Sequence, residues 1–410
     1  MLPAIKVLCA CWIIGLFVEN RIAFAQSVSN IEAPQTWQNL SSSLNTSTNG
    51  TNDLSFGLKY LVFPQISSKV TEIQNILLAH ITSGSFFPFK SRLRSTFNGV
   101  EFWIVYATVA EIVAIARLLG QDAWVVRSTS RFEPQGTLSL NTTKGRSKSI
   151  QHQWSPSWDL SYVSWAPDVP FHNVHSYAFE EDVMQDTYIY VIEDGVDATH
   201  HEFTSMLNPR ITWMFPPWGS KTSTDDAPGR WSSHGTCVAS KAAGSNYGVA
   251  KDTNLVVLKA TYDVEDVIWA LVTAHKHIST NNRQRRAVVL FTYATDGSAA
   301  QDPEMVRIRE IMGKLHDLDA TIVVPSGNYA RFTSQVSTVP AVWGTSDFPL
   351  IVVGGVQRTG FSSEISQGSS SDLAAFAPGE NVLCATAGNG FSFLTGTSAA
   401  SGMVDLPHCI

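Results

Sequence analysis

The chain has 410 residues, 44% of them hydrophobic and 15% charged, which is the composition of a globular protein with room for two or three domains and a large core. Disorder of the whole chain is therefore excluded. The formal net charge is -7, and the short basic run Arg283-Gln284-Arg285-Arg286 is typical of a solvated loop between a helix and a strand. We expect no nucleic-acid partner.

The first 25 residues have the pattern of a secretory signal peptide. Lys6 precedes an apolar run from Val7 to Val18, and Ala23-Phe24-Ala25 forms a cleavage site before Gln26. A membrane anchor is the alternative, but the apolar run is much shorter than the ~20 residues that a spanning helix needs. We therefore predict a secreted, extracellular protein that has no membrane association after signal cleavage.

Export also decides how the cysteines are interpreted. Cys9 and Cys11 would leave with the signal peptide, so that Cys237, Cys384 and Cys409 remain. An odd number leaves at least one thiol unpaired within the chain, and the sequence does not say which two would pair.

Residues 26–53 are rich in Ser, Thr and Asn and are expected to form a flexible segment that does not fold alone. Four asparagines fit the pattern of N-glycosylation acceptors: Asn39, Asn45, Asn49 and Asn141. Residues 129–153 are again polar, show no apolar periodicity and are expected to form a linker.

Residues 54–128 alternate between strand-like and helix-like segments. Strands are predicted at 59–63, 99–105 and 123–126, and amphipathic helices at 70–77 and 109–119, the second of which is stopped by Gly120. The order corresponds to a small β-α-β-β-α-β (ferredoxin-like) α+β module. The pattern alone also fits many unrelated small domains.

Residues 154–410 alternate as a parallel α/β sheet requires. Asp263 is predicted to cap one helix, and Asp302 is predicted to cap another that has Pro303 at its first position. The predicted strands are 188–192, 255–258, 287–291, 321–324, 350–353 and 381–384.

Four short blocks in this region carry the chemistry. An apolar run ends at Glu193-Asp194-Gly195, His234-Gly235-Thr236 begins an Ala-rich helix, and Ser326-Gly327-Asn328 and Gly396-Thr397-Ser398 follow far downstream. Each block alone is more often a turn or a core segment. Their order, with an acid first, then a histidine, then a serine, is that of one type of serine protease triad.

These blocks resemble the subtilisin-like serine proteases, most closely the secreted fungal branch with its proteinase-K-like members. The resemblance extends from Trp154 to the C-terminus and is weaker over 58–126. It implies that Ser398 is the nucleophile, that His234 is its base, and that Asn328 and the backbone amide of Ser398 bind the oxyanion. It also implies a subtilisin-like parallel sheet flanked by helices.

The resemblance further implies a secreted serine endopeptidase that is made as a zymogen. Residues 54–128 would be its prodomain, an intramolecular inhibitor, and the linker 129–153 would contain the maturation site, whose bond the sequence does not fix. We expect a monomer that acts on protein or peptide substrates. No cofactor is required; structural calcium is frequent in the family, but no acidic cluster here forms a ligand pattern.

Three features depart from the family. Glu193 stands where the family has the triad aspartate, with Asp194 as the alternative acid, and Phe291 to Gly297 has no clean match to the family's Ser-Leu-Gly-Gly stretch. The extra methylene of Glu193 would displace the carboxylate by about 1.5 Å, so that from the sequence Glu193→Asp is expected to raise turnover. Few residues follow Ser398, which suggests a peptidase domain (154–410) that is truncated at its C-terminus.

These departures support a second hypothesis, a catalytically impaired or inactive secreted relative that acts by binding peptides or partners.

Overall fold

The structure is a computed structural model that describes residues 58–128, 132–134, 137–139, 152–165, 171–179, 186–205, 211–219, 221, 233–251, 253–369 and 371–404. The predicted signal peptide, the segment 26–53, the four candidate glycosylation sites, most of the linker 129–153 and Cys409 lie outside these ranges. No helix within the described ranges is long and apolar enough to cross a membrane.

A seven-stranded, fully parallel sheet forms the centre of the larger part of the molecule. Its strands are runs rich in Val, Ile and Leu because helices cover both faces. In spatial order they are β10 (Ile211–Met214), β11 (Asn254–Lys259), β9 (Tyr188–Glu193), β12 (Ala287–Phe291), β14 (Thr321–Pro325), β16 (Ile351–Val356) and β17 (Ala375–Pro378).

All six predicted strands are present, and five of them lie in this sheet. The segment 381–384 belongs to β18 (Val382–Thr386), which pairs antiparallel with β19 (Gly390–Thr395) in a separate hairpin. Its turn contains Gly388 and Asn389, both with positive φ, and such a turn favours a tight hairpin over a crossover to the parallel sheet. The edge strands β10 and β17 were not predicted.

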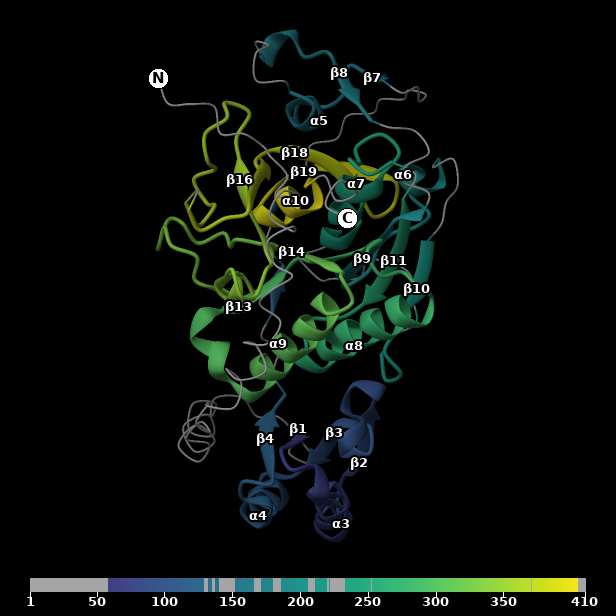
Figure 1. Cartoon of the computed structure of the whole chain (residues 1–410), viewed down its shortest axis with the longest axis vertical. Coiled ribbons are helices and arrows are strands. Elements are labelled where there is room, and N and C mark those ends of the chain that lie inside the picture. The colour runs from purple at the N-terminus through teal and green to yellow at the C-terminus, as the bar shows by residue number, and fades with distance from the viewer. Residues whose placement is uncertain are drawn as a thin grey trace.

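Helices cover the two faces of the parallel sheet (Figure 1). On one face lie α8 (Val264–Thr280) and α9 (Pro303–His316), whose apolar residues share a core with β9, β12 and β14. On the other face α7 (His234–Ala243) and α10 (Thr397–Gly402) pack together with α5 (Trp158–Val163).

Both predicted helix caps occupy the N-cap position, but neither aspartate makes a side-chain capping hydrogen bond. The carboxylate of Asp263 instead accepts a hydrogen bond from Lys59 at 3.0 Å. The remaining elements are short: α6 (His201–Thr204), β7 (His152–Trp154), β8 (Ser176–Ala178), β13 (Tyr293–Asp296), β15 (Thr338–Val339) and the 3-10 turns Ser67–Lys69, Arg92–Phe97, Phe171–Asn173, Gly297–Gln301 and Ala341–Trp343.

The N-terminal module, which we define as Leu58–Arg127, has the predicted β-α-β-β-α-β order. Its strands form an antiparallel sheet in the order β2-β3-β1-β4, and Thr108 with Glu111 forms a capping box on its second helix. The strand β2 was not resolved as a separate element in the sequence. The elements are β1 (Leu58–Pro64), α3 (Val70–His80), β2 (Ser85–Lys90), β3 (Val100–Ala107), α4 (Val109–Leu119) and β4 (Ala123–Arg127).

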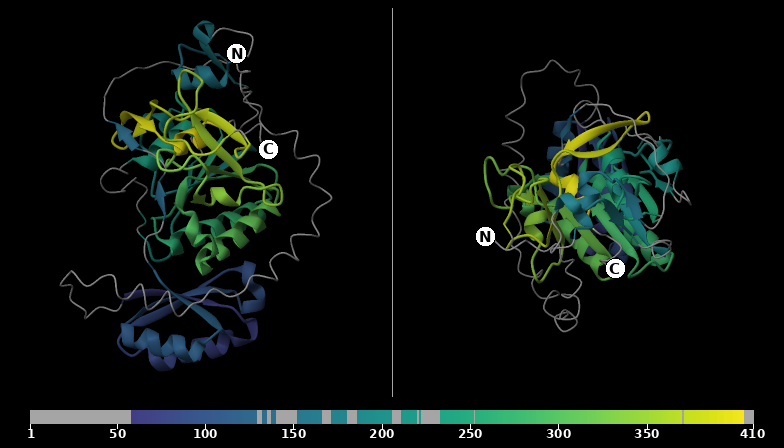
Figure 2. Two further views of the ribbon diagram at one scale, coloured as in Figure 1. Left: turned by 90° about the vertical axis from the view of Figure 1, so that its left-hand side faces the viewer. Right: turned by 90° about the horizontal axis from the view of Figure 1, so that it is seen from above.

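The open face of the module's sheet packs against α8 and α9, as Figure 1 and the left view of Figure 2 show. Phe89 and Phe102 contact Trp218 of the larger part, with ring centroids 5.6 and 6.4 Å apart. Arg307 on α9 donates from Nε to the buried carboxylate of Glu101 at 2.9 Å. The interface therefore combines an aromatic core with a buried ion pair.

We expect Arg307→Met to destabilise the docked module, because Glu101 is fully buried and would lose its cation. Breaking one side of a buried pair costs about 3 to 5 kcal/mol, which chemical unfolding of the full chain would measure. The matched control is Arg331→Met, whose partner Glu364 lies 3.4 Å away across an exposed pair worth less than about 1 kcal/mol. Equal losses in the two variants would contradict this view of the interface.

His277 on α8 gives a pH-dependent contribution to stability. Its pKa is lowered to about 4, first by burial and then by the charge of Arg283, whose Nη1 lies 3.1 Å from His277 Nδ1. Because the folded pKa lies below the unfolded value of about 6.5, the stabilisation is complete above pH ~6.5 and is lost as the pH falls toward 4. For this partly exposed ring we expect a loss of about 1 kcal/mol after solvent screening.

His277→Gln should flatten this dependence, which urea unfolding at about pH 7.5 and about pH 4.5 would detect. His316→Gln, on the exposed end of α9, is the control and should leave the slope of the parent chain unchanged. A His277→Gln slope equal to that of the parent would show that another group titrates.

Candidate active site

Glu193 and His234 lie side by side at the carboxyl end of β9, an interior strand of the parallel sheet. Glu193 is the last residue of that strand and His234 is the first residue of α7. The Nδ1 atom of His234 lies 3.1 Å from Oε1 and 3.2 Å from Oε2 of Glu193, and both side chains are buried. A carboxylate at Nδ1 holds an imidazole in one tautomer and stabilises its protonated form.

Close packing brings the two residues together. A Cβ on Gly235 would lie 2.9 Å from Cβ of Glu193 and 2.1 Å from the carbonyl oxygen of Gly195, so only glycine fits after the histidine. Asp194, the alternative acid, points elsewhere: its Oδ2 accepts a hydrogen bond from the Tyr262 hydroxyl at 3.2 Å. The strand ends at Glu193, so Asp194 lies one residue beyond it, and the two neighbouring acids face different partners.

Ser398 comes to the same place from the C-terminal end of the described chain. It lies in the first turn of α10, directly after β19, and its side chain is fully buried. Its Oγ donates to the carbonyl oxygen of Thr292 at 3.4 Å, and the Thr292 hydroxyl donates to Glu193 Oε1. Thr292 therefore connects the serine to the acid.

Sequence reasoning missed Thr292. The one available signal was its position directly after the apolar strand 287–291, where parallel strands end at the same edge as β9. That edge is where α/β proteins place their sites.

Asn328 lies next to the serine. Its Oδ1 accepts hydrogen bonds from the backbone N–H and the hydroxyl of Thr397, both at 2.9 Å. With the amide oxygen occupied in this way, the NH₂ group is the end that is left to donate. The arrangement gives the site an amide donor and, from Ser398, a backbone N–H.

Two short strands from the segment after the N-terminal module flank the serine. Strand β5 (Glu133–Pro134) pairs antiparallel with β13, which begins one residue after Thr292. Strand β6 (Thr137–Ser139) pairs antiparallel with β19 and sets Thr137 opposite Thr395. The stretch from Phe291 to Gly297, which departs from the family in sequence, thus still offers a backbone edge to an extended chain.

Phe132 anchors this segment. It is 3% exposed, and its ring meets Phe291 edge to face with centroids 5.8 Å apart. Its backbone N–H points to the carbonyl oxygen of Tyr262 at 3.5 Å. An extended chain with an aromatic side chain in a pocket is a common mode of peptide recognition.

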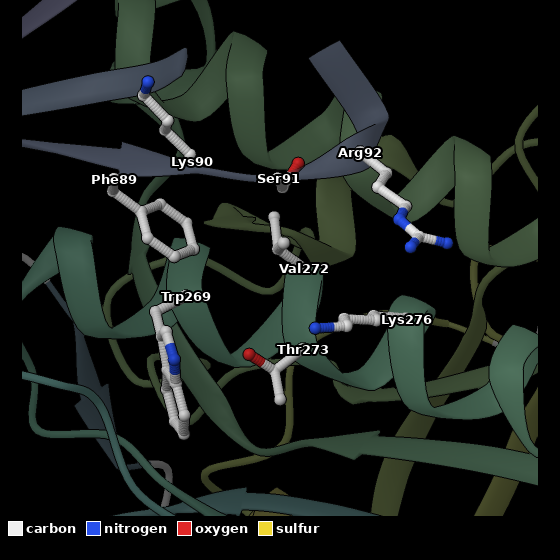
Figure 3. A pocket seen from close by; sticks show the side chains of 8 residues that line it. All are labelled: Phe89, Lys90, Ser91, Arg92, Trp269, Val272, Thr273 and Lys276. Carbon is white, nitrogen blue, oxygen red and sulfur yellow. The ribbon is translucent and has the colours of Figure 1, made fainter. Parts of the chain in front are cut away.

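A cavity of about 330 Å³ lies elsewhere, between the N-terminal module and α8. Figure 3 shows residues 89–92 on one side of it and side chains of α8 on the other. Its lining residues come from the N-terminal module and from α8 and do not include Glu193, His234 or Ser398, so the cavity is part of the interface.

Within the described ranges, no three His, Cys, Asp or Glu side chains are grouped so that they could hold a metal ion. His275 and His277 lie two residues apart on α8, and Nδ1 of His277 lies 3.0 Å from the Tyr190 hydroxyl.

Known proteins with a similar sequence are subtilisin-like proteases by name. The chain is 29% identical over 260 residues to subtilisin-like protease 2 of Trichophyton rubrum, which covers 60% of this chain and 54% of that protein. It is 26% identical over 260 residues to subtilisin-like protease 3 of Arthroderma benhamiae, with 60% of this chain and 56% of that protein covered. The chain spans about half the length of the curated relatives it matches.

Among solved structures, the fold is similar to the epidermin leader peptide processing serine protease of Staphylococcus aureus. The TM-score is 0.57 at 15% identity, with 85% of this chain and 86% of that chain covered. The subtilase family model matches residues 184–404, which is more than half of the chain and contains Glu193, His234, Asn328 and Ser398. The chain belongs to the subtilase family.

Proposed function

We propose that this chain is a secreted serine endopeptidase, made as a zymogen, which uses Glu193, His234 and Ser398. The observation that carries the proposal is the placement of three side chains, distant in sequence, at one sheet edge, with Glu193 3.1 Å from His234. Family membership supports the same reaction class.

In this reaction Ser398 Oγ attacks the carbonyl carbon of the substrate and passes its proton to His234. The Glu193 carboxylate keeps Nδ1 protonated and stabilises the imidazolium that results. The negative charge that develops on the substrate oxygen would be met by the Asn328 amide and the Ser398 backbone N–H. His234 then returns the proton to the leaving amine, and water repeats the sequence on the acyl-enzyme.

The zymogen part of the proposal rests on the two flanking strands and on burial. Glu193, His234 and Ser398 are each at most 1% exposed, so a substrate reaches them only after the segment that carries β5 and β6 has moved. The docked N-terminal module, which holds that segment's upstream end, would act as the intramolecular inhibitor. Secretion is proposed on the predicted signal peptide.

Cleavage of a quenched fluorescent peptide that copies residues 130–139 tests the activity against the binding alternative. An endopeptidase hydrolyses the peptide, and Ser398→Ala abolishes the cleavage while it leaves binding intact. A binding protein would show peptide binding by fluorescence polarisation in both forms and cleavage in neither. Binding without cleavage would contradict the proposed endopeptidase activity.

We further expect the chain to cut itself between Pro134 and Thr137, because β5 and β6 approach Ser398 from opposite sides. The middle bond of this interval joins Gln135 to Gly136. N-terminal sequencing of the secreted protein should therefore find a new terminus at Gly136, and Ser398→Ala should remain uncut. A terminus outside 135–137, or processing that persists in Ser398→Ala, would contradict this assignment.

A further inference from the structure

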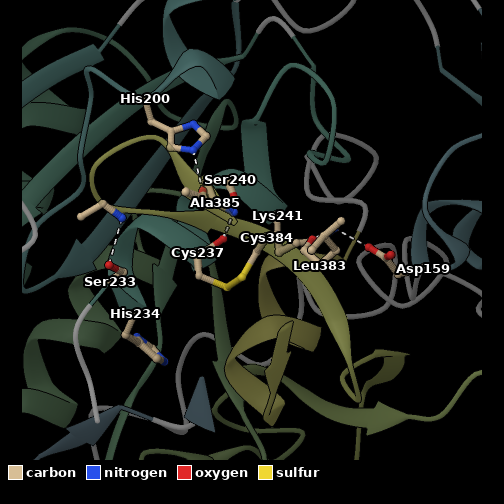
Figure 4. The surroundings of a disulfide bond; sticks show 12 residues. Asp159, His200, Ser233, His234, Cys237, Ser240, Lys241, Leu383, Cys384 and Ala385 are labelled. Carbon is tan, nitrogen blue, oxygen red and sulfur yellow. Dashed lines mark hydrogen bonds and ion pairs between the residues drawn. A yellow bond between two sulfur atoms is a disulfide. The ribbon is translucent and has the colours of Figure 1, made fainter. Parts of the chain in front are cut away.

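The helix that begins with His234 is fastened to the β18–β19 hairpin by a row of side chains on one face. The N-cap residue Ser233 and the helix residues Cys237, Ser240 and Lys241 follow one another at helical spacing and all contact residues 383–387 (Figure 4). We call this row the α7–β18 clamp.

The clamp has one covalent and three hydrogen-bonded contacts. Cys237 and Cys384 form a disulfide, and both residues are fully buried. Ser233 Oγ accepts from the Ala387 N–H at 2.9 Å, and Ser240 Oγ accepts from the Ala385 N–H at 3.0 Å. Lys241 Nζ donates to the Leu383 carbonyl oxygen at 3.2 Å and also pairs with the buried Asp159.

The clamp lies between the two catalytic groups that must meet. Cys237 is one helical turn after His234, and Cys384 sits opposite Ser392 on β19, the strand that leads directly to Ser398. The histidine and the serine are thus joined through a short, buried path that does not pass through the parallel sheet.

The backbone before His234 shows why such a fastening is needed. Ser233 has a φ of 68°, in the left-handed region that non-glycine residues adopt only at an energetic cost. Such a conformation persists when surrounding contacts determine it, and the hydrogen bond from Ala387 is one of them. Without the clamp, the start of α7 is free to relax away from the hairpin.

We propose that the Cys237–Cys384 disulfide is a positioning element for catalysis, which sets the orientation of His234 relative to Ser398. The inference rests on the proposed protease function for its kinetic readout. Misplacement of a catalytic group by about 1 Å costs about 100-fold in rate, and substrate binding on β13 and β19 does not depend on the imidazole. Loss of the bridge should therefore lower kcat and spare KM.

The test compares the parent chain, a double cysteine variant and a control variant. All three carry Cys409→Ser, which prevents thiol exchange. The Cys237→Ala/Cys384→Ala double variant should lose about tenfold or more in kcat, with KM for the 130–139 peptide changed by less than about twofold. Val257→Ala, a buried change on β11 in the same core, is the matched control. It should lower the thermal midpoint but keep kcat per folded molecule.

If the double variant does not fold, the folded parent is reduced with dithiothreitol instead. The bridge then takes up two electrons and two protons, its S–S bond breaks to give two thiols, and dithiothreitol is oxidised to its own disulfide. Activity should fall with the appearance of the two thiols and return on reoxidation. Activity that does not follow the thiol count overturns the proposal, as does a folded double variant whose kcat is unchanged.

A readout that needs no activity separates this inference from the proposed function. In Ser398→Ala protein, the Nδ1 proton of His234 held by Glu193 should give a downfield proton resonance in NMR. We expect that resonance to be lost or shifted without the bridge and to be retained in Val257→Ala. An unchanged resonance in the double variant would show that the disulfide does not position His234. This result would overturn the proposal whether or not the chain proves to be a protease.

Discussion

Replacement of His234 by alanine is expected to lower kcat by about 10⁶-fold, while KM for a peptide substrate stays nearly constant. His234 contacts the buried carboxylate of Glu193, which ends a strand at the sheet edge near Ser398. Without it, no group accepts the serine proton, and only the oxyanion donors and substrate binding still contribute. Initial-rate kinetics with the 130–139 peptide measure the loss.

The control is His316→Ala, because His316 is exposed at the end of α9, far in the fold from the carboxyl end of β9. It should match the parent in both constants. If His234→Ala kept more than about one hundredth of the parent's kcat, another base would have to serve and the triad would be assigned wrongly.

The second large effect concerns Glu193. Glu193→Ala is expected to lower kcat by about 10⁴-fold, because the imidazole loses the group that fixes its tautomer. The sequence alone favoured aspartate at this position, but the contacts in the structure favour glutamate. The glutamate already reaches Nδ1 at 3.1 Å and accepts a hydrogen bond from Thr292, and an aspartate would draw the carboxylate back by about 1.5 Å. We therefore expect Glu193→Asp to lower kcat as well, by about 100-fold.

Asp194→Asn is the matched control, since it removes an acid one residue away whose carboxylate contacts Tyr262 instead of the histidine. Its effect on kcat should be the smaller one. A larger loss in Asp194→Asn than in Glu193→Ala would place the wrong acid in the triad. A gain in Glu193→Asp would restore the expectation drawn from the sequence.

The fold was largely predictable because its strands are buried on both faces and therefore appear as continuous apolar runs. The segments 188–192, 255–258 and 287–291 are of this kind, and all three were predicted. The edge strand β10 was missed because its residues are only partly buried and its sequence lacks such a run. Residues 381–384 look like a core strand, yet the turn at Gly388 and Asn389 directs them into a hairpin.

Only those residues of the candidate site that lie in sequence motifs could be predicted. Glu193, His234, Asn328 and Ser398 stand in recognisable blocks, and the structure places them at one sheet edge. For Thr292 the only signal was its position directly after an apolar strand, and the partner of Cys237 carries no local signal, because both roles arise from contacts between segments distant in sequence. The pairing of the strands 133–134 and 137–139 with β13 and β19 also depends on contacts between segments distant in sequence.

The most direct test of the account is covalent labelling with a fluorophosphonate, which reacts with a serine only when a neighbouring base activates it. The processed protein is treated with the reagent and the modified residue is located by mass spectrometry. We predict modification at Ser398, none in Ser398→Ala, and a rate at least ~1000-fold slower in His234→Ala. Absence of labelling in the folded, processed parent, or labelling of another serine that persists in Ser398→Ala, would contradict the account.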